Sequence, residues 1–308
     1  MILCITPNPA IDRTLILPNL VLGKVHRAEK VIVAAGGKGL NVARAVYILG
    51  GQAMCMGFVG GHNGRLLADL AQNEGINTSW TWINSETRTC TILISQNGDA
   101  TLINEPGIPG STADWARLQV DVREHIPAAG QVCICGSLPP NSTADDLHKL
   151  LGMLMSSGKQ VWADTSGIAL DTLLTYPGIC IKVNGDEIGK SIGFEVSDVP
   201  SAKRALMDLI KRGIAACIVT LGAGGALLAT QIGRWYVQPP SVRVVSTVGS
   251  GDSFLGGFLN ALDNGRDWSE ALCEAVAAGT ANALSEGGGQ FRFLEYKEIQ
   301  SQVQVESW

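Results

Sequence analysis

The sequence has no uninterrupted run of about 18 apolar residues, the length that a membrane-spanning helix needs. Charge is sparse and nearly balanced: 23 basic residues stand against 28 acidic ones, and charged residues make up 17% of the chain. A protein that coats a nucleic-acid backbone needs an excess of basic residues, which is missing here. Hydrophobic residues make up 46% of the chain, which excludes a disordered protein. We therefore expect a globular protein with no nucleic-acid and no membrane partner.

The sequence also lacks the cysteine spacings of a metal site or of a disulfide framework. Its eight cysteines lie mostly within apolar, strand-like runs, where a cysteine behaves as a small buried hydrophobe in a reducing compartment. Residues 1–7 enter a strand directly, without the basic and apolar regions of a secretory signal. We expect a cytoplasmic protein.

Short apolar runs alternate with helical patterns along most of the chain. This arrangement is typical of an α/β fold, in which helices cover both faces of a mostly parallel central sheet. We predict strands at residues 2–6, 53–59, 132–135, 160–163, 180–183 and 217–220. We predict helices at residues 38–49, 64–73, 113–125, 144–155 and 254–262. Ser111 and Thr143 each stand three residues before an aspartate, which predicts a capping box at the start of each following helix.

Two stretches, residues 10–33 and 80–105, break this alternation. They carry strand-like runs of mixed polarity with no helix between them, and Asn97-Gly98 is a hairpin turn signal. We predict that they form a small β-sheet lid on a single domain that spans residues 1–308. The alternative is a meander at the edge of the main sheet.

The strongest local motif is VGSGDS at residues 248–253, which leads into a predicted helix. Gly249, Ser250 and Gly251 are small, so their backbone N–H groups can point outward at the helix N-terminus and hold a phosphoryl group. Asp252 beside them could accept a proton from an attacking hydroxyl, and we expect the helix N-terminus to stabilise its ionised form. On these residues alone, the alternative is a tight turn followed by an acidic residue at a helix start.

Three further motifs lie where a predicted strand meets a helix or a turn. The cluster GGKGLNVAR at residues 36–44 allows a ligand to approach closely, and its asparagine could bind sugar hydroxyls. The cluster TLGAGG at residues 220–225 follows a strand, at the end where α/β sheets bind ligands. Asn184 and Glu187 are three residues apart, so they would share a helix face and could orient water around Mg²⁺. Taken alone, the first cluster could also be a capped turn, and the Asn184–Glu187 pair could be solvated surface.

Two familiar nucleotide-binding motifs are missing. Residues 185–191 resemble a P-loop, but only three residues separate Gly185 from Gly189 where four are needed. No G-x-G-x-x-G follows a strand, so dinucleotide binding is not supported.

The paired signatures GGKGLNVARAVYILGG (residues 36–51) and TVGSGDSFLGGF (residues 247–258) resemble those of the ribokinase-like (PfkB) carbohydrate kinases. The similarity extends over essentially the whole chain. The segments TPNPAID, TR, GSLPP and PPSV, which begin at residues 6, 87, 136 and 239, resemble the hexose-phosphate branch of that family. That branch contains 1-phosphofructokinase, tagatose-6-phosphate kinase and the minor 6-phosphofructokinase.

The resemblance implies a role for each matching residue. Asp252 would be the catalytic base, and the anion hole would consist of Gly249, Ser250 and Gly251. Sugar hydroxyls would be bound by Asp12, Gly37, Gly39 and Asn41, with Ser137 near the substrate. The phosphate already on the sugar would be held by Lys24, Arg27 and Arg88. ATP and Mg²⁺ would be served by Lys182, Asn184, Glu187, Thr220, Gly222 and Gly225, with Asn184 and Glu187 acting on the metal through water.

The resemblance implies an ATP-dependent hexose-phosphate kinase that converts fructose 1-phosphate to fructose 1,6-bisphosphate. Since lids in this family commonly pair between subunits, it also implies a homodimer through the lid. Tagatose-6-phosphate kinase and 6-phosphofructokinase are the alternatives within the branch, and a non-catalytic sugar or nucleotide sensor is the alternative outside it. The branch markers point both ways. Residues 104–107 (NEPG) and 114–115 (DW) favour 1-phosphofructokinase, whereas GGKGLN and VGSGD favour tagatose-6-phosphate kinase.

Overall fold

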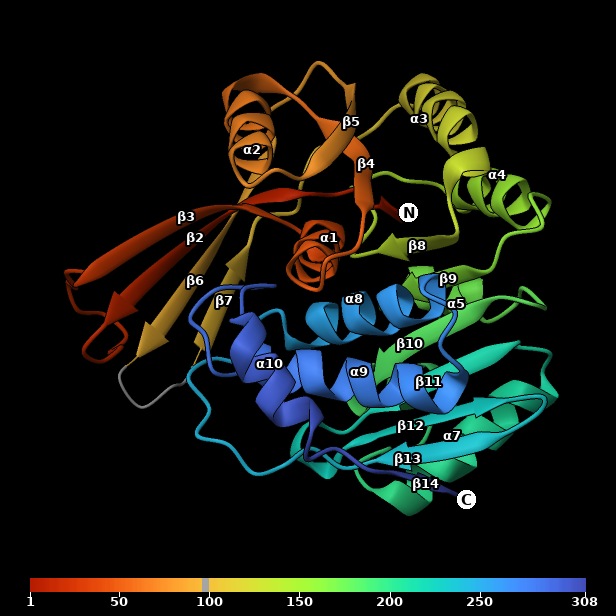
Figure 1. Ribbon diagram of the computed structural model, residues 1–308. Helices are drawn as coiled ribbons and strands as arrows, with labels where there is room; N and C mark the ends of the chain where they lie inside the picture. The colour runs from red at the N-terminus through yellow and green to blue at the C-terminus, as the bar shows by residue number, and fades with distance from the viewer. Residues whose placement is uncertain (96–99) are drawn as a thin grey trace.

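The computed structural model describes residues 1–95 and 100–308 and contains two sheets (Figure 1). The strands of the large sheet are β1 (Ile2–Ile5), β4 (Ala53–Val59), β5 (Asn77–Trp82), β8 (Gln131–Cys135), β9 (Val161–Asp164), β10 (Cys180–Asn184), β11 (Ala216–Thr220), β12 (Ala226–Thr230), β13 (Arg234–Val237) and β14 (Val305–Ser307). They lie in the order β14-β13-β12-β11-β10-β9-β8-β1-β4-β5. From β5 to β11 every neighbouring pair is parallel, and β12, β13 and β14 continue the sheet antiparallel. The predicted mostly parallel sheet is confirmed.

Helices cover both faces of the large sheet (Figure 1). They are α1 (Lys38–Ile48), α2 (Gly61–Asn73), α3 (Thr112–His125), α4 (Ala144–Met155), α5 (Ile168–Leu173), α6 (Gly185–Ile192), α7 (Val199–Lys211), α8 (Ser250–Asp263), α9 (Trp268–Asn282) and α10 (Phe293–Gln300). Single 3₁₀ turns lie at Ile126–Ala128 and Gly222–Gly224. The predicted capping boxes are present: Ser111 Oγ accepts a hydrogen bond from the Asp114 N–H, and Thr143 Oγ1 accepts one from the Asp146 N–H. These bonds satisfy N–H groups that a helix start otherwise leaves unpaired.

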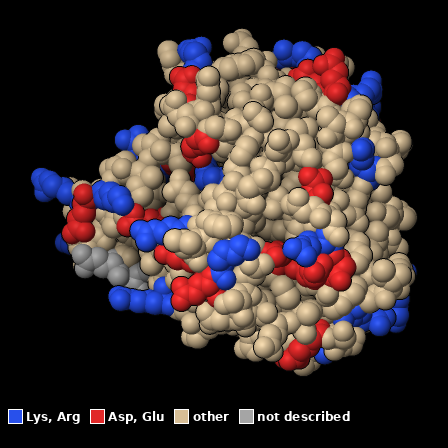
Figure 2. Space-filling view, viewed as in Figure 1, with Lys and Arg blue, Asp and Glu red and all other residues tan. Residues whose placement is uncertain are grey.

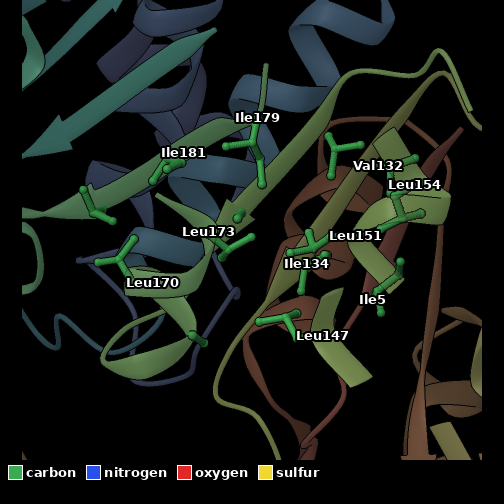
Figure 3. Close-up of a cluster of buried hydrophobic side chains, with 14 of the residues drawn as sticks. Ile5, Val132, Ile134, Leu147, Leu151, Leu154, Leu170, Leu173, Ile179 and Ile181 are labelled. Atoms are coloured by element: carbon green, nitrogen blue, oxygen red, sulfur yellow. The ribbon is translucent and has the colours of Figure 1, made fainter. Parts of the chain in front are cut away.

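The two faces of the sheet pack into separate buried clusters. On one face, side chains of β1, β8 and β10 meet those of α4 and α5, as Figure 3 shows with Ile134 against Leu147 and Leu151. On the other face, α1, α8 and α9 cover a cluster that includes Trp162 and Phe258, whose rings meet edge to face at 4.9 Å. Most of the cysteines belong to these cores, and all eight are free thiols. Because the strands are buried on both faces, they read as continuous apolar runs in the sequence.

The small sheet stands apart from the large one and projects from the body of the molecule (Figure 1). It consists of β3 (Lys30–Gly36), β2 (Ala10–Leu17), β6 (Arg88–Ser95) and β7 (Ala100–Asn104), in that order. A smaller separate sheet was therefore predicted correctly, although its action as a lid stays a prediction. The turn signal Asn97-Gly98 lies outside the described residues.

Two boundaries of the predicted small sheet are wrong. Residues 80–83 were given to it, but β5 is the edge strand of the large sheet and pairs in parallel with β4, with Trp80 opposite Gly57. The helix α2 makes the crossover between these two parallel strands, and the edge position of β5 explains its mixed polarity. Within the predicted stretch 10–33, the chain leaves the sheet after β2, where Pro18 stands, and turns at Gly23, whose φ of 77° favours glycine. The strand β3 therefore begins only at Lys30.

The described helices include none that is both long and apolar enough to cross a membrane. Figure 2 shows basic and acidic side chains interspersed over one face of the molecule, with large areas that carry neither. No single-sign surface gathers on that face, in keeping with the balanced composition.

Candidate active site

A cavity of about 650 Å³ opens beside the carboxyl ends of β10 and β11. Parallel sheets bind ligands at this edge, where the strands give way to loops and helix starts. Residues predicted to serve the nucleotide or its phosphates line it: Lys182, Asn184, Thr220, Gly222, Gly225, Ser250 and Gly251. The remaining wall is largely apolar and includes Val244, Phe254 and Val276. The cavity lining thus combines polar and small residues with an apolar wall.

The start of α8 forms part of the polar lining of this cavity. Gly249 is the N-terminal cap and has a φ of 76°, in the left-handed region that favours glycine. A Cβ atom at this position would lie 2.5 Å from the Cα of Gly288, so the backbone needs glycine for space as well. The Ser250 N–H donates a 3.2 Å hydrogen bond to the Thr247 carbonyl. This N–H group and those that follow it sit at the positive end of the helix dipole, where an anion is favoured.

Asp252 lies in the first turn of α8, and only 7% of its surface is exposed. The Nδ2 group of Asn41 donates a 2.8 Å hydrogen bond to its Oδ2. Burial raises the pKa of the Asp252 carboxyl, and the positive charges of Lys38 and Lys182 oppose that rise only in part. That the helix N-terminus stabilises the ionised form stays a prediction, and burial works against it because it removes the hydration of the carboxylate. A raised pKa makes this carboxylate a better proton acceptor.

Asp12 on β2 faces the same region from the small sheet. Burial raises the pKa of its carboxyl to about 6, with Arg44 opposing the rise and Asp252 adding to it. Gly36 at the end of β3 leaves room for it: a Cβ atom there would lie 2.1 Å from the Asp12 carboxyl carbon. Asp12 and Asp252, which are 240 residues apart in the sequence, thus interact electrostatically within one site.

No sequence motif indicates the buried carboxylate that pairs with Lys38 and Lys182. Asp164, at the end of β9, has no exposed surface and accepts a 2.6 Å hydrogen bond from Lys38 Nζ and a 2.7 Å bond from Lys182 Nζ. These two ammonium groups hold the pKa of the Asp164 carboxyl low against the effect of its burial. Lys38 also lies 3.7 Å from Glu187 Oε1. A lone aspartate after a strand is too common to single out, so only the fold reveals Asp164.

Asn184 and Glu187 form a reciprocal cap at the start of α6. Asn184 Oδ1 accepts a hydrogen bond from the Glu187 N–H, and Glu187 Oε2 accepts one from the Asn184 N–H. The second carboxylate oxygen of Glu187 is free of this cap. The described residues contain no group of three or more histidine, cysteine or acidic side chains placed to hold a metal directly.

The predicted phosphate-binding residues are not all together. The Arg88 guanidinium donates to the backbone carbonyls of Asn8, at 2.9 and 3.2 Å, and of Glu105, at 3.0 Å. Asn8 in turn donates a 3.1 Å hydrogen bond to Ser137 Oγ, so Arg88 and Ser137 share one neighbour that the sequence did not indicate. Lys24 and Arg27 instead stand exposed on the loop after β2.

Comparison with known protein families shows which family the chain belongs to. Residues 5–292 match the pfkB family carbohydrate kinases, and the chain belongs to that family. Its class is therefore that of ATP-dependent sugar kinases.

Solved structures narrow the likeness to phosphofructokinases. The tetrameric inhibited form of phosphofructokinase-2 from Escherichia coli is 27% identical, with a TM-score of 0.90 and 98% of each chain covered. The same enzyme in complex with fructose-6-phosphate is 25% identical over 98% of each chain, with a TM-score of 0.88. A Thermotoga maritima protein described as a possible 1-phosphofructokinase is 22% identical, covers 100% of this chain and 99% of its own, and has a TM-score of 0.90. That last likeness shows the fold alone. This chain is similar to these proteins over its whole length and is a sugar-phosphate kinase of the pfkB family.

Proposed function

We propose that this protein phosphorylates fructose 1-phosphate to fructose 1,6-bisphosphate with ATP, with Asp252 as the base. The observation that carries the proposal is the placement of buried Asp252 beside Ser250 and Gly251, which line the cavity, and within electrostatic reach of Asp12. The site would then bring together a proton acceptor (Asp252), an anion-binding helix start (α8) and a carboxylate able to bind sugar hydroxyls (Asp12). A sensor that only binds its ligands has no need of a buried base.

In the proposed reaction, a sugar hydroxyl held by Asp12 and Asn41 attacks the terminal phosphorus of ATP. The new O–P bond forms as the bond to the bridging oxygen of ADP breaks, and the hydroxyl proton passes to Asp252. The N–H groups of residues 249–251 stabilise the negative charge on the transferring group. Lys182 lies against that turn, because a Cβ atom on Gly251 would be 2.7 Å from its Nζ. The positive charge of Lys182 would also stabilise the transferring phosphoryl group.

The site fits Mg²⁺ held through water better than Mg²⁺ held directly. Glu187 keeps one carboxylate oxygen outside the α6 cap, and its side chain is 19% exposed, so it can accept hydrogen bonds from metal-bound water. Mg²⁺ gives up water reluctantly and is commonly bound by substrate phosphates and few carboxylates. When bound, the cation would neutralise charge on the nucleotide phosphates.

Fructose 6-phosphate is the second candidate substrate, because the E. coli enzyme of similar structure has been solved with it. Fructose 1-phosphate is preferred because residues 104–107, a 1-phosphofructokinase marker, contact the phosphate-site residues. Arg88 donates to the Glu105 carbonyl, and Asn8 Nδ2 lies 3.2 Å from the Pro106 carbonyl. Tagatose 6-phosphate remains the third.

A coupled ADP-release assay with these three sugar phosphates, free fructose and ribose tests the proposal. We expect fructose 1-phosphate to give the highest kcat/KM and free fructose to be about 10² to 10⁴-fold worse, because a charged pairing is lost. Arg88→Ala should raise KM for the sugar phosphate far more than KM for ATP. A higher kcat/KM with another sugar phosphate would show that this compound, and not fructose 1-phosphate, is the substrate. Equal turnover of free fructose would refute the proposed binding site for the sugar's phosphate.

Two further proposals concern the protein as a whole. The small sheet would pair with that of a second copy, since its strands and the loop after β2 expose Leu22, Val25, Val31, Leu102 and Ile103. The second proposal is that the protein works in a reducing compartment such as the cytoplasm, because all eight of the chain's cysteines are free thiols.

A further inference from the structure

Arg44 on α1 lies within the GGKGLNVAR motif, but neither the motif nor the proposed reaction gives it a role. Its side chain is buried, and its five N–H groups meet five acceptors. Two of these acceptors are the carboxylate oxygens of Glu74. The others are the Ala35 carbonyl at 2.7 Å, the Gly288 carbonyl at 2.9 Å and Asn41 Oδ1 at 2.8 Å. No other side chain could replace this planar set of donors.

The bond from Arg44 fixes which way the Asn41 amide points. A guanidinium only donates and a carboxylate only accepts, so Asn41 must turn Oδ1 toward Arg44 and Nδ2 toward Asp252. The reverse orientation would set an N–H against the guanidinium and an oxygen against the Asp252 carboxylate. Both contacts would then repel.

The same guanidinium also holds the loop behind the anion hole. A Cβ atom on Gly288 would lie 3.0 Å from Asn41 Nδ2, and one on Gly249 would lie 2.5 Å from the Gly288 Cα. Gly288 is therefore packed between the amide that contacts the base and the cap of α8. The hydrogen bond from Arg44 to the Gly288 carbonyl ties that loop to α1.

We propose that Arg44 is a positioning residue for phosphoryl transfer, which acts through Asn41 to hold the Asp252 carboxylate in place. This inference rests on the proposed function. It assigns Arg44 no contact with substrate. The pair of bonds from Arg44 to Asn41 and from Asn41 to Asp252 predicts that removal of Arg44 lowers kcat and leaves the nucleotide cavity intact.

A double-mutant cycle on the full chain tests this. Arg44→Lys keeps a positive charge for Glu74, but a single ammonium cannot reach all five acceptors. We expect it to lower kcat about 10-fold or more, with KM for ATP changed less than about two-fold. In the Asn41→Ala background, the same substitution should change kcat less than about two-fold, because the amide through which it acts is gone. Arg266→Met, which removes an exposed arginine paired with Glu270, should match the wild type.

Each other outcome decides against the inference. Additive effects of Arg44→Lys and Asn41→Ala would show that Arg44 does not act through Asn41. A lower unfolding midpoint with unchanged kcat would make Arg44 purely structural. Should Arg44→Lys not fold, Arg44→Gln combined with Glu74→Gln removes both charges of this ion pair together and enters the same cycle. A wild type that phosphorylates none of the sugars would refute the proposed function first, whereas an active wild type with additive variants refutes only the role of Arg44.

Discussion

At the scale of single residues, the environment of Asp252 decides its chemistry. Its neighbours come from three elements: Asn41 and Lys38 from α1, Asp164 from β9 and Lys182 from β10. Sequence motifs indicated Asp252 and Asn41 together, because each opens a helix after a glycine cluster. They could not indicate that burial would raise the pKa of Asp252, because burial depends on how α1 and α8 pack.

Asp252→Asn keeps the shape of the side chain and removes the proton acceptor. We expect kcat to fall about 10²-fold or more, while the affinities for ATP and the sugar phosphate largely persist. Steady-state kinetics and calorimetry measure the two separately. Asp69→Asn, on the exposed face of α2, is the matched control. Turnover within a few-fold of the wild type would reduce Asp252 to a helix-start residue.

The buried carboxyl of Asp12 should lower the stability of the protein at neutral pH although it supports sugar binding. Burial raises the pKa of its carboxyl from 3.8 to about 6, so the folded state binds a proton more tightly than the unfolded one. The contribution of Asp12 to the free energy of unfolding is therefore fully present below about pH 4 and is lost as the pH rises through about 6. At pH 7 this loss amounts to about 3 kcal/mol. Asp12→Asn should thus raise the free energy of unfolding at pH 7 but not at pH 4, while it weakens sugar binding. Urea unfolding at both pH values checks this, and a destabilised variant at pH 7 would contradict it.

At the scale of elements, strands buried on both faces were the easiest to predict. β4 was predicted from residue 53 to 59 as it stands, because its apolar residues run without a break. β5 was misassigned, since it is an edge strand with one unpaired edge and its mixed polarity is also typical of a small, partly exposed sheet. The start of β3 was missed because residues before Lys30 have strand-like composition but lie in a loop.

The turn before α8 gives a prediction with a matched control. Gly249 and Gly265 have φ angles of 76° and 77°, but a Cβ on Gly249 would meet Gly288 at 2.5 Å, whereas one on Gly265 meets nothing within 4 Å. Gly265→Ala should therefore lose only about 1 kcal/mol, from backbone strain. Gly249→Ala should lose more and should also lower kcat, because the anion-hole turn must shift. Urea unfolding and kinetics on both variants measure the difference, and equal losses without a change in kcat would show that the close approach does not matter.

At the scale of the whole molecule, the site is assembled from parts that are distant in the sequence. Asp12 comes from the small sheet, Lys38, Asn41 and Arg44 from α1, and Asp252 from α8. Local patterns found most of these residues, but Asp164 and Asn8 came to light only once the strands were ordered side by side. Asp164 and Asn8 form hydrogen bonds with other site residues, and their neighbours in the sequence do not indicate these contacts.

The small sheet exposes apolar side chains that a soluble monomer would ordinarily cover, which is the ground for the proposed dimer. Leu102 on β7 is 50% exposed and lies opposite Ile92 of β6, so it shares a face with that residue. Leu102→Asp should shift the protein toward the monomer, because a charge would be buried in the interface. It should also raise KM for the sugar phosphate, since Asp12 and Arg88 lie on strands of the same sheet. Leu294→Asp on α10, where the leucine is 81% exposed, is the control that should change neither property. Sedimentation velocity at several concentrations measures the oligomeric state, and a Leu102→Asp variant that sediments like the wild type would refute pairing through this face.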